Sequence, residues 1–209
     1  MVRNLLFDLG GVVMDIRRSD CVEAFKRLGM TDADKYLNEY AQAGPFEKIE
    51  NGSATIESFH EDIRSIIGRP ELTDREIDEA YGRFLIGIPL HRLHELTELR
   101  KRFGIYMLSN TNPIMWADGI SSFFAQEGHD VNYYFDGIVR SYEARVMKPA
   151  PGIFQAAIDR FGFDPRETIF LDDSEKNLEA ARKFGFQTLL VAPGQEFYDL
   201  LKQYPGLDL

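Results

Sequence analysis

Residues 5–11 read Leu5-Leu6-Phe7-Asp8-Leu9-Gly10-Gly11, a short apolar run that stops at an acid and then turns through two glycines. An uninterrupted apolar run of this length is typical of a strand that is buried on both faces of a parallel sheet. The same order recurs at residues 104–110, which end in Ser109-Asn110, and at residues 168–173, which end in Asp172-Asp173. We therefore expect three buried strands that each end in polar side chains.

Further strands and helices are predicted around these three. Residues 137–139 and 188–191 form two more apolar runs. Between the strand candidates, apolar residues recur at helical spacing, most clearly at residues 93–103, 153–161 and 178–184. This alternation, from about residue 89 onward, indicates an α/β fold with a Rossmann-like, doubly wound parallel sheet and right-handed crossovers.

Residues 16–88 have a different pattern. No run in this region reads as a buried strand, and three segments between residues 22 and 85 show helical spacing instead. This predicts a helical domain inserted after the first strand. We therefore divide the chain into an α/β core of residues 1–15 and 89–209 and an α-helical cap of residues 16–88.

Composition excludes several classes of partner. The chain has 209 residues, is 44% hydrophobic and carries a net charge of −10. This hydrophobic content is sufficient for a globular protein with a buried core. Nucleic acids and anionic membranes attract proteins through Lys and Arg, so we expect no nucleic acid and no membrane partner.

The single cysteine, Cys21, cannot form an internal disulfide, which fits a reducing compartment. The first apolar run is too short to cross a bilayer, and it lacks a basic leader and a small-residue cleavage site. We therefore expect a cytoplasmic protein without a targeting or membrane segment.

Asp8, Asp172 and Asp173 follow strands of the predicted sheet, and open α/β sheets bind ligands at the carboxyl ends of their strands. Three carboxylates that converge there repel one another unless a pKa rises or a hard divalent cation binds them. Mg²⁺ prefers a few carboxylates together with water and substrate phosphate. The pattern therefore predicts a magnesium site that accepts a phosphorylated substrate.

At these residues the sequence resembles the haloacid dehalogenase (HAD) superfamily of phosphotransferases. The segments that resemble its four motifs, in order, are residues 6–12, 108–110, 147–154 and 170–174. That superfamily carries a helical cap between its first two motifs, where the insert of this chain lies. Among its branches, the sequence most resembles the bacterial alpha-D-glucose-1-phosphate phosphatases and the phosphatase domain of soluble epoxide hydrolases.

The resemblance implies catalytic and substrate-binding roles. Asp8 would attack phosphorus in line and form an aspartyl-phosphate that water then hydrolyses. Lys148, the hydroxyl of Ser109 and a backbone N–H near Asn110 would bind the remaining phosphoryl oxygens, where charge is spread in the transition state.

The resemblance also implies that Mg²⁺ is held by Asp8, the backbone carbonyl of Gly10 and Asp173, with Asp172 helping directly or through water. Gly10 departs from the usual motif, which has at this position a second aspartate that acts as general acid and base. Its loss should cost ~10²–10⁴-fold in rate unless another group replaces it. We hypothesise that Gly10 favours esters with better leaving groups, such as anomeric, acyl or aryl phosphates.

The expected function is magnesium-dependent hydrolysis of a small phosphomonoester, such as a sugar phosphate, by a monomer or homodimer. The alternatives are a 2-haloacid dehalogenase or a sugar phosphomutase of the same superfamily, or a non-catalytic phosphate-binding relative. Activity without magnesium would favour the dehalogenase, and a bisphosphate requirement would favour the mutase. Failure to turn over a broad panel of phosphate esters would favour the binding protein.

Other polar residues receive simpler interpretations. His91 and His94 are three apart on a predicted helix and could in principle bind zinc, but no third ligand accompanies them in sequence, so we favour surface histidines. Asp15 is expected to act as a hinge residue rather than as a substitute general acid. Residues 47–52 resemble a cap stretch that can face the active site, and no substrate contact is assigned to them.

Overall fold

The computed structural model describes residues 1–37, 42–207 and 209, and its main sheet is parallel throughout. The sheet strands are β1 (Asn4–Phe7), β4 (Gly104–Ser109), β5 (Gly137–Arg140), β6 (Thr168–Asp172) and β7 (Gln187–Leu190). In space their order is β5-β4-β1-β6-β7, so the chain starts in the middle and builds first one edge and then the other. This is a doubly wound sheet, and the predicted fold class is confirmed.

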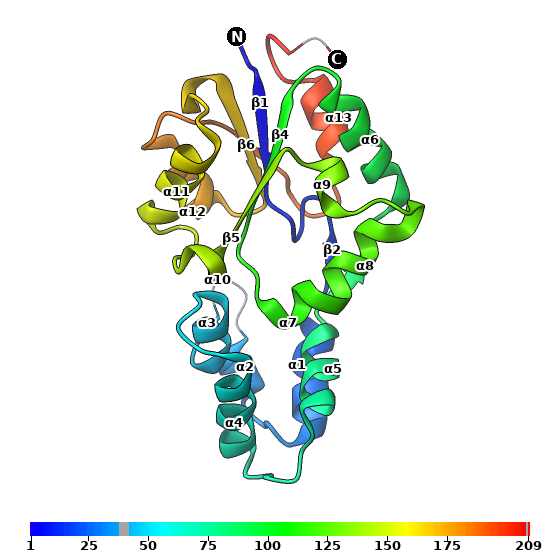
Figure 1. Ribbon diagram of the computed structural model, residues 1–209, viewed down its shortest axis with the longest axis vertical. Coiled ribbons are helices and arrows are strands. Elements are labelled where there is room, and N and C mark those ends of the chain that lie inside the picture. The colour runs from blue at the N-terminus through cyan, green and yellow to red at the C-terminus, as the bar shows by residue number, and fades with distance from the viewer. Residues whose placement is uncertain (38–41, 208) are drawn as a thin grey trace.

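Helices cover both faces of the sheet, as Figure 1 shows. On one face lie α11 (Pro151–Phe161) and α12 (Glu175–Arg182), and on the other lie α6 (Leu90–Arg100) and α13 (Phe197–Lys202). Successive residues of β1 serve the two faces, because Leu6 packs with α11 and α12 whereas Leu5 and Phe7 pack with α6 and α13. Burial on both faces explains why the strand is apolar at each position.

Short helical turns connect the remaining parts of the core. They are α7 (Pro113–Met115), the π-helical turn η1 (Trp116–Ile120), α8 (Ser121–Phe124), α9 (Val131–Tyr134), α10 (Ser141–Ala144) and the 3₁₀ turns η2 (Ala125–Glu127) and η3 (Pro165–Glu167). The predicted core helices are present, although α6 ends at Arg100 rather than at residue 103. The chain turns there to enter β4 at Gly104.

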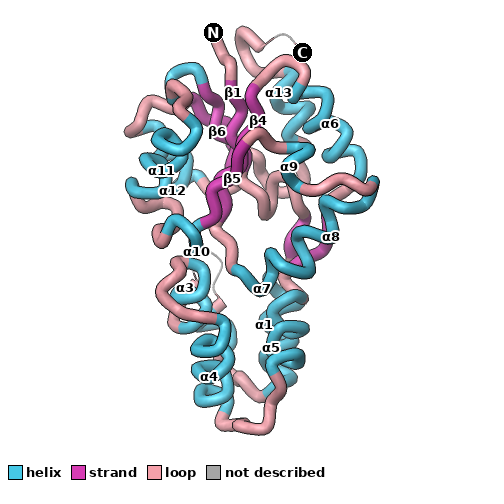
Figure 2. The backbone as a smooth tube through the Cα atoms, viewed as in Figure 1, coloured by secondary structure: helices cyan, strands magenta, loops and turns pink. Residues whose placement is uncertain are grey.

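A group of helices lies beyond the carboxyl ends of the strands, below the sheet in Figures 1 and 2. This helical insert contains α1 (Arg18–Leu28), α2 (Ala33–Tyr36), α3 (Pro45–Glu50), α4 (Ile56–Ile67) and α5 (Asp74–Gly82). The ring of Phe46 packs edge-on against those of Phe25, Phe59 and Tyr81, with centroids 5.0, 5.4 and 5.2 Å away. Aromatic packing of this kind joins helices that are distant in sequence.

Two short antiparallel strands, β2 (Asp15–Ile16) and β3 (Leu85–Gly87), join the insert to the core. The sequence predicted no strand here and continued a helical segment to residue 85, which was wrong, because α5 ends at Gly82. Both strands are only partly buried, so they lack the continuous apolar run that identifies a buried strand. Among the described residues, no helix is both long and apolar enough to cross a membrane.

Candidate active site

The carboxyl ends of β1 and β6 bring the three predicted acids together. Asp8 follows β1 directly, Asp172 ends β6, and Asp173 comes next in the chain. One carboxylate oxygen from each of the three lies within 4.8 Å of the other two. The backbone N–H of Asp8 donates to the carbonyl of Leu171 at 2.8 Å, so the pairing of the two strands continues up to the acids. Neighbouring parallel strands therefore fix the spacing of the group.

Lys148, from the loop before α11, lies between two of these acids. Its Nζ is 2.7 Å from Oδ1 of Asp8 and 2.7 Å from Oδ2 of Asp172, and its side chain is 1% exposed. Lys148 contacts two of the three carboxylates, so with all three ionised the group carries an excess of negative charge. Such an excess, in a set of oxygen donors, fits a hard divalent cation such as Mg²⁺.

The pKa values of the group reflect this crowding. Burial, opposed by the charge of Lys148 and reinforced by the carboxylates of Asp172 and Asp173, raises the pKa of Asp8 to about 8. Burial and the charge of Asp172 also raise the pKa of Asp173. For Lys148, burial lowers the pKa, but the charges of Asp172 and Asp8 outweigh it and raise the pKa overall. A bound cation would relieve the repulsion among the carboxylates.

Asp172 is held in place by the start of α12. Its Oδ1 accepts hydrogen bonds from the backbone N–H of Ser174 and from Nδ2 of Asn177, both at 2.9 Å, while its Oδ2 faces Lys148. The sequence alone suggested no role for Asn177. The structure shows that it orients Asp172, and through Asp172 it also holds the lysine.

Asn110 contacts the backbone of Lys148. Its Oδ1 accepts from the N–H of Lys148 at 2.8 Å, and its Nδ2 donates to the carbonyl of Lys148 at 3.0 Å. The Asn110 side chain therefore positions the lysine, a role that the sequence did not suggest. The substrate contact near Asn110, which concerned a backbone N–H, stays a prediction.

Ser109 ends β4 beside β1 and is buried, and its hydroxyl donates to the carbonyl of Asn110 at 3.3 Å. Next in the chain, Thr111 exchanges two hydrogen bonds with Ser141: the N–H of Thr111 donates to Oγ of Ser141, and that hydroxyl donates to the carbonyl of Thr111, both at 3.0 Å. Ser141, which sequence analysis missed, thus ties the loop after β4 to the end of β5.

The two glycines after Asp8 have different surroundings. Gly11 has φ 79°, and a Cβ added to it would lie 2.4 Å from Oδ2 of Asp173. Only glycine permits this approach. A Cβ on Gly10 would meet Cδ1 of Ile16 at 3.3 Å, a tighter than usual but apolar contact. Gly11 therefore keeps the space beside Asp173 open.

The insert meets the core close to Lys148. A cavity of about 590 Å³ is lined by Glu47, Asn51 and Gly52 of the insert and by the core residues 145–150, which include Lys148. Gly52 has φ 71°, and a Cβ there would lie 2.1 Å from the carbonyl oxygen of Tyr142. Backbone therefore contacts backbone where the insert rests on the core.

The other residues that the sequence singled out contact residues other than the three aspartates or are buried. Asp15, in β2, accepts a hydrogen bond from Nη1 of Arg92 at 2.8 Å, and its role as a hinge residue stays a prediction. Cys21 is fully buried. His91 and His94 do not act as a pair, since His91 pairs with Glu196 and His94 pairs with Glu127.

Comparison with known proteins identifies relatives over nearly the whole chain. A family model described as haloacid dehalogenase-like hydrolase matches residues 2–185. The chain is 37% identical to D-ribitol-5-phosphate phosphatase of Bacteroides thetaiotaomicron, over 94% of this chain and 95% of that protein. It is 27% identical to bifunctional epoxide hydrolase 2 of Mus musculus, over 91% of this chain but 36% of that protein.

Solved structures agree with these relationships. A HAD family enzyme from Bacteroides thetaiotaomicron, solved with magnesium and inorganic phosphate, superposes with a TM-score of 0.89 at 36% identity, covering 96% of this chain and 99% of that one. A protein described as a predicted HAD-like family hydrolase from Porphyromonas gingivalis gives a TM-score of 0.90 at 30% identity, covering 97% of both chains. The chain belongs to the haloacid dehalogenase-like hydrolases.

Proposed function

We propose that the protein is a magnesium-dependent phosphatase that hydrolyses a small phosphomonoester of a sugar or sugar alcohol. The observation that carries the proposal is the buried contact of Lys148 Nζ with both Asp8 and Asp172, at 2.7 Å each, beside Asp173. The similarity to a phosphatase that acts on D-ribitol 5-phosphate supports the substrate class.

In this proposal Asp8 is the nucleophile. Its Oδ1 accepts from the N–H of Leu9 at 2.7 Å and lies 2.7 Å from Lys148, so the carboxylate cannot rotate freely. The other oxygen can then be directed in line at phosphorus, to form the aspartyl-phosphate. Lys148 has three N–H donors, of which Asp8 and Asp172 take two. The third would bind a phosphoryl oxygen, together with the hydroxyl of Ser109.

Mg²⁺ would be held by Asp8, the backbone carbonyl of Gly10 and Asp173. When bound, it would neutralise charge on the phosphoryl group. Both oxygens of Asp172 already accept hydrogen bonds from protein donors. We therefore assign Asp172 an indirect contribution, in which it positions Lys148 and reaches the cation through water.

With glycine at position 10, the site lacks the aspartate that usually donates a proton to the leaving group. Asp15 does not replace that aspartate in our proposal, because its carboxylate accepts from Arg92. We therefore retain the hypothesis that anomeric, acyl or aryl phosphates are hydrolysed faster than alkyl phosphates, so that sugar-alcohol phosphates would be the slower members of the proposed substrate class. A rate series over leaving-group pKa tests it with wild type and Gly10→Asp, and the hypothesis fails if the two proteins give equal slopes.

We also propose that residues 16–88 are a cap that closes over the substrate and limits the access of water. The cavity between the insert and the Lys148 loop supports this assignment. A cytoplasmic location and a monomeric or homodimeric state complete the proposal. Light scattering after size-exclusion chromatography would measure the oligomeric state.

A panel of phosphate esters, assayed with Mg²⁺ and with EDTA, tests the proposed activity. We expect phosphate release from small sugar or polyol phosphates that requires Mg²⁺ and is lost in Asp8→Asn. Phosphate release that survives Asp8→Asn would show that the proposed nucleophile is wrong. Halide release from 2-haloacids that EDTA leaves unchanged would favour the dehalogenase alternative.

A further inference from the structure

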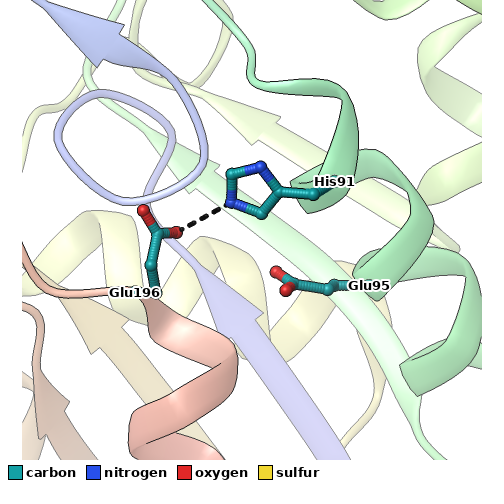
Figure 3. A group of neighbouring side chains, drawn as sticks. All are labelled: His91, Glu95 and Glu196. Carbon is teal, nitrogen blue, oxygen red and sulfur yellow. Dashed lines mark hydrogen bonds and ion pairs between the residues drawn. The ribbon is translucent and has the colours of Figure 1, made fainter.

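A second group of metal-ligating side chains lies between α6 and the start of α13 (Figure 3). His91 and Glu95 are one helical turn apart on α6, and Glu196 directly precedes α13. Side chains at this spacing share one face of a helix. One potential ligand atom from each of the three lies within 4.8 Å of the other two. We propose that His91, Glu95 and Glu196 bind a divalent metal ion of the Zn²⁺ type.

The spacing of two of these ligands already suits such an ion. Nε2 of His91 and Oε2 of Glu196 are 3.3 Å apart. Zinc bonds of about 2.0–2.1 Å in a tetrahedron place neighbouring ligand atoms about 3.3 Å apart. Figure 3 shows the carboxylate of Glu95 pointing toward the space between them. A small side-chain movement of Glu95 would complete three protein ligands, with water as the fourth.

Glu95 provides an observation independent of this spacing. Its Oε2 is buried and has no hydrogen-bond partner among the described residues. A buried carboxylate oxygen without a partner is unfavourable, and a cation bound at this position would satisfy it.

Glu196 is oriented by Arg92 in the way that outer hydrogen bonds orient metal ligands. Nε of Arg92 donates to Oε2 at 2.8 Å and Nη2 donates to Oε1 at 3.0 Å. Each carboxylate oxygen has two lone pairs, so Oε2 can accept from Arg92 and also bind a metal. Arg92 also pairs with Asp15, so the carboxylates of Glu95 and Glu196 retain negative charge for a cation.

The donor set indicates the class of metal. One imidazole nitrogen and two carboxylates suit Zn²⁺ and similar transition ions, whereas Mg²⁺ prefers oxygen ligands alone. On binding, Nε2 of His91 would be unprotonated and would bind the metal instead of hydrogen-bonding to Glu196, which would itself be a ligand. The ion would then link α6 to the segment that leads into the C-terminal helix.

Calorimetric titration of the full-length protein with Zn²⁺, in excess Mg²⁺, tests the proposal without any assay of turnover. The variants are His91→Ala and Glu95→Gln, and the control is His94→Ala, an exposed histidine of the same helix that pairs with Glu127. Wild type and the three variants all keep the site of Asp8, so any Zn²⁺ that binds there contributes equally to the four titrations. The differences between proteins therefore report the second site, and circular dichroism verifies that each variant is folded.

We expect wild type and His94→Ala to bind one more Zn²⁺ than His91→Ala, and Glu95→Gln to bind this ion at least about tenfold more weakly. Co²⁺ in place of Zn²⁺ should give a visible absorption band that His91→Ala lacks. Equal Zn²⁺ binding by wild type and His91→Ala, or equal loss in His94→Ala, would overturn the proposal. Neither outcome would affect the phosphatase proposal, which concerns other residues.

Discussion

Buried acids occur in both the core and the helical insert, but their partners differ. In the core, Asp8 and Asp172 share the ammonium group of Lys148. In the insert, Glu50 is buried against the neutral hydroxyl of Tyr81, which donates to it at 3.1 Å. Burial, opposed by that hydrogen bond, raises the pKa of Glu50 to about 7. Burial also raises the pKa of Asp8, to about 8, so the two acids differ in their partners and not in the direction of the shift: Asp8 contacts an ammonium group that favours its charged form, whereas Glu50 has a neutral hydroxyl.

Burial of an acid therefore does not by itself identify a catalytic residue. The core acids are placed by paired strands, and two of them share the ammonium group of Lys148. A bound Mg²⁺ would balance the remaining negative charge. Glu50 instead joins α3 to α5 inside the insert. Four predictions test the comparison.

The largest effect should come from removing the charged partner in the core. Lys148→Met leaves Asp8 and Asp172 adjacent without their cation and removes a donor to the phosphoryl group. We expect kcat/KM to fall about 10³-fold at saturating Mg²⁺. Lys183→Met, which removes an exposed lysine at the end of α12, should leave kcat/KM nearly unchanged. A loss below tenfold in Lys148→Met would mean that the lysine is not essential to the site.

Glu50→Gln should change how stability depends on pH. The folded pKa of about 7 lies above the ordinary 4.5, so the folded state holds this proton more tightly than the unfolded state. The contribution of Glu50 to stability is thus fully present below about pH 4.5 and is lost as pH rises through 7. Between pH 5 and pH 8, wild type should lose about 2–3 kcal/mol more unfolding free energy than Glu50→Gln. Urea unfolding measures this difference, and parallel pH profiles would contradict it.

Gly11→Ala should weaken magnesium binding. The added Cβ would lie 2.4 Å from Oδ2 of Asp173 and would displace that carboxylate. We expect the Mg²⁺ concentration for half-maximal activity to rise about 10-fold or more. Gly10→Ala, whose Cβ would meet Ile16 at 3.3 Å, is the matched control and should change it less. Equal effects of the two substitutions would show that the space beside Asp173 is not the cause.

Gly52→Ala should separate the insert from the core. Its Cβ would overlap the carbonyl of Tyr142, whereas Gly68, with nearly the same φ of 73°, has nothing within 4 Å of an added Cβ. Both substitutions should cost about 1 kcal/mol of stability because of the backbone conformation. Only Gly52→Ala should raise KM, by about fivefold (~1 kcal/mol), in steady-state assays. An equal rise in KM for Gly68→Ala would assign the effect to strain alone.

The sequence was informative where residues near one another in the chain carry the signal. The strands of the sheet appear as uninterrupted apolar runs because both faces are covered, and their polar ends predicted where the acids meet. Strands β2 and β3 gave no such signal, since they are short and partly exposed.

Contacts between distant residues could not be predicted in the same way. Asn110 and Lys148 are 38 residues apart in the sequence, and Thr111 and Ser141 are 30 residues apart. Single polar residues in loops follow no periodic pattern, so the sequence does not indicate which of them meet. Glu196 lies 105 residues from His91, so the sequence did not indicate their contact, and His94, which the sequence places near His91, pairs with Glu127 instead. Loop residues acquire such roles from the topology that brings them together.

Trapping the covalent intermediate would identify the nucleophile. Wild-type protein is mixed with Mg²⁺ and a substrate found in the ester panel, quenched in acid and reduced with borohydride, which converts an aspartyl-phosphate to homoserine. Peptide mass spectrometry then reads residue 8. The proposed mechanism predicts homoserine at position 8, and only when substrate is present. An unmodified Asp8 during turnover, or modification at another residue, would contradict it.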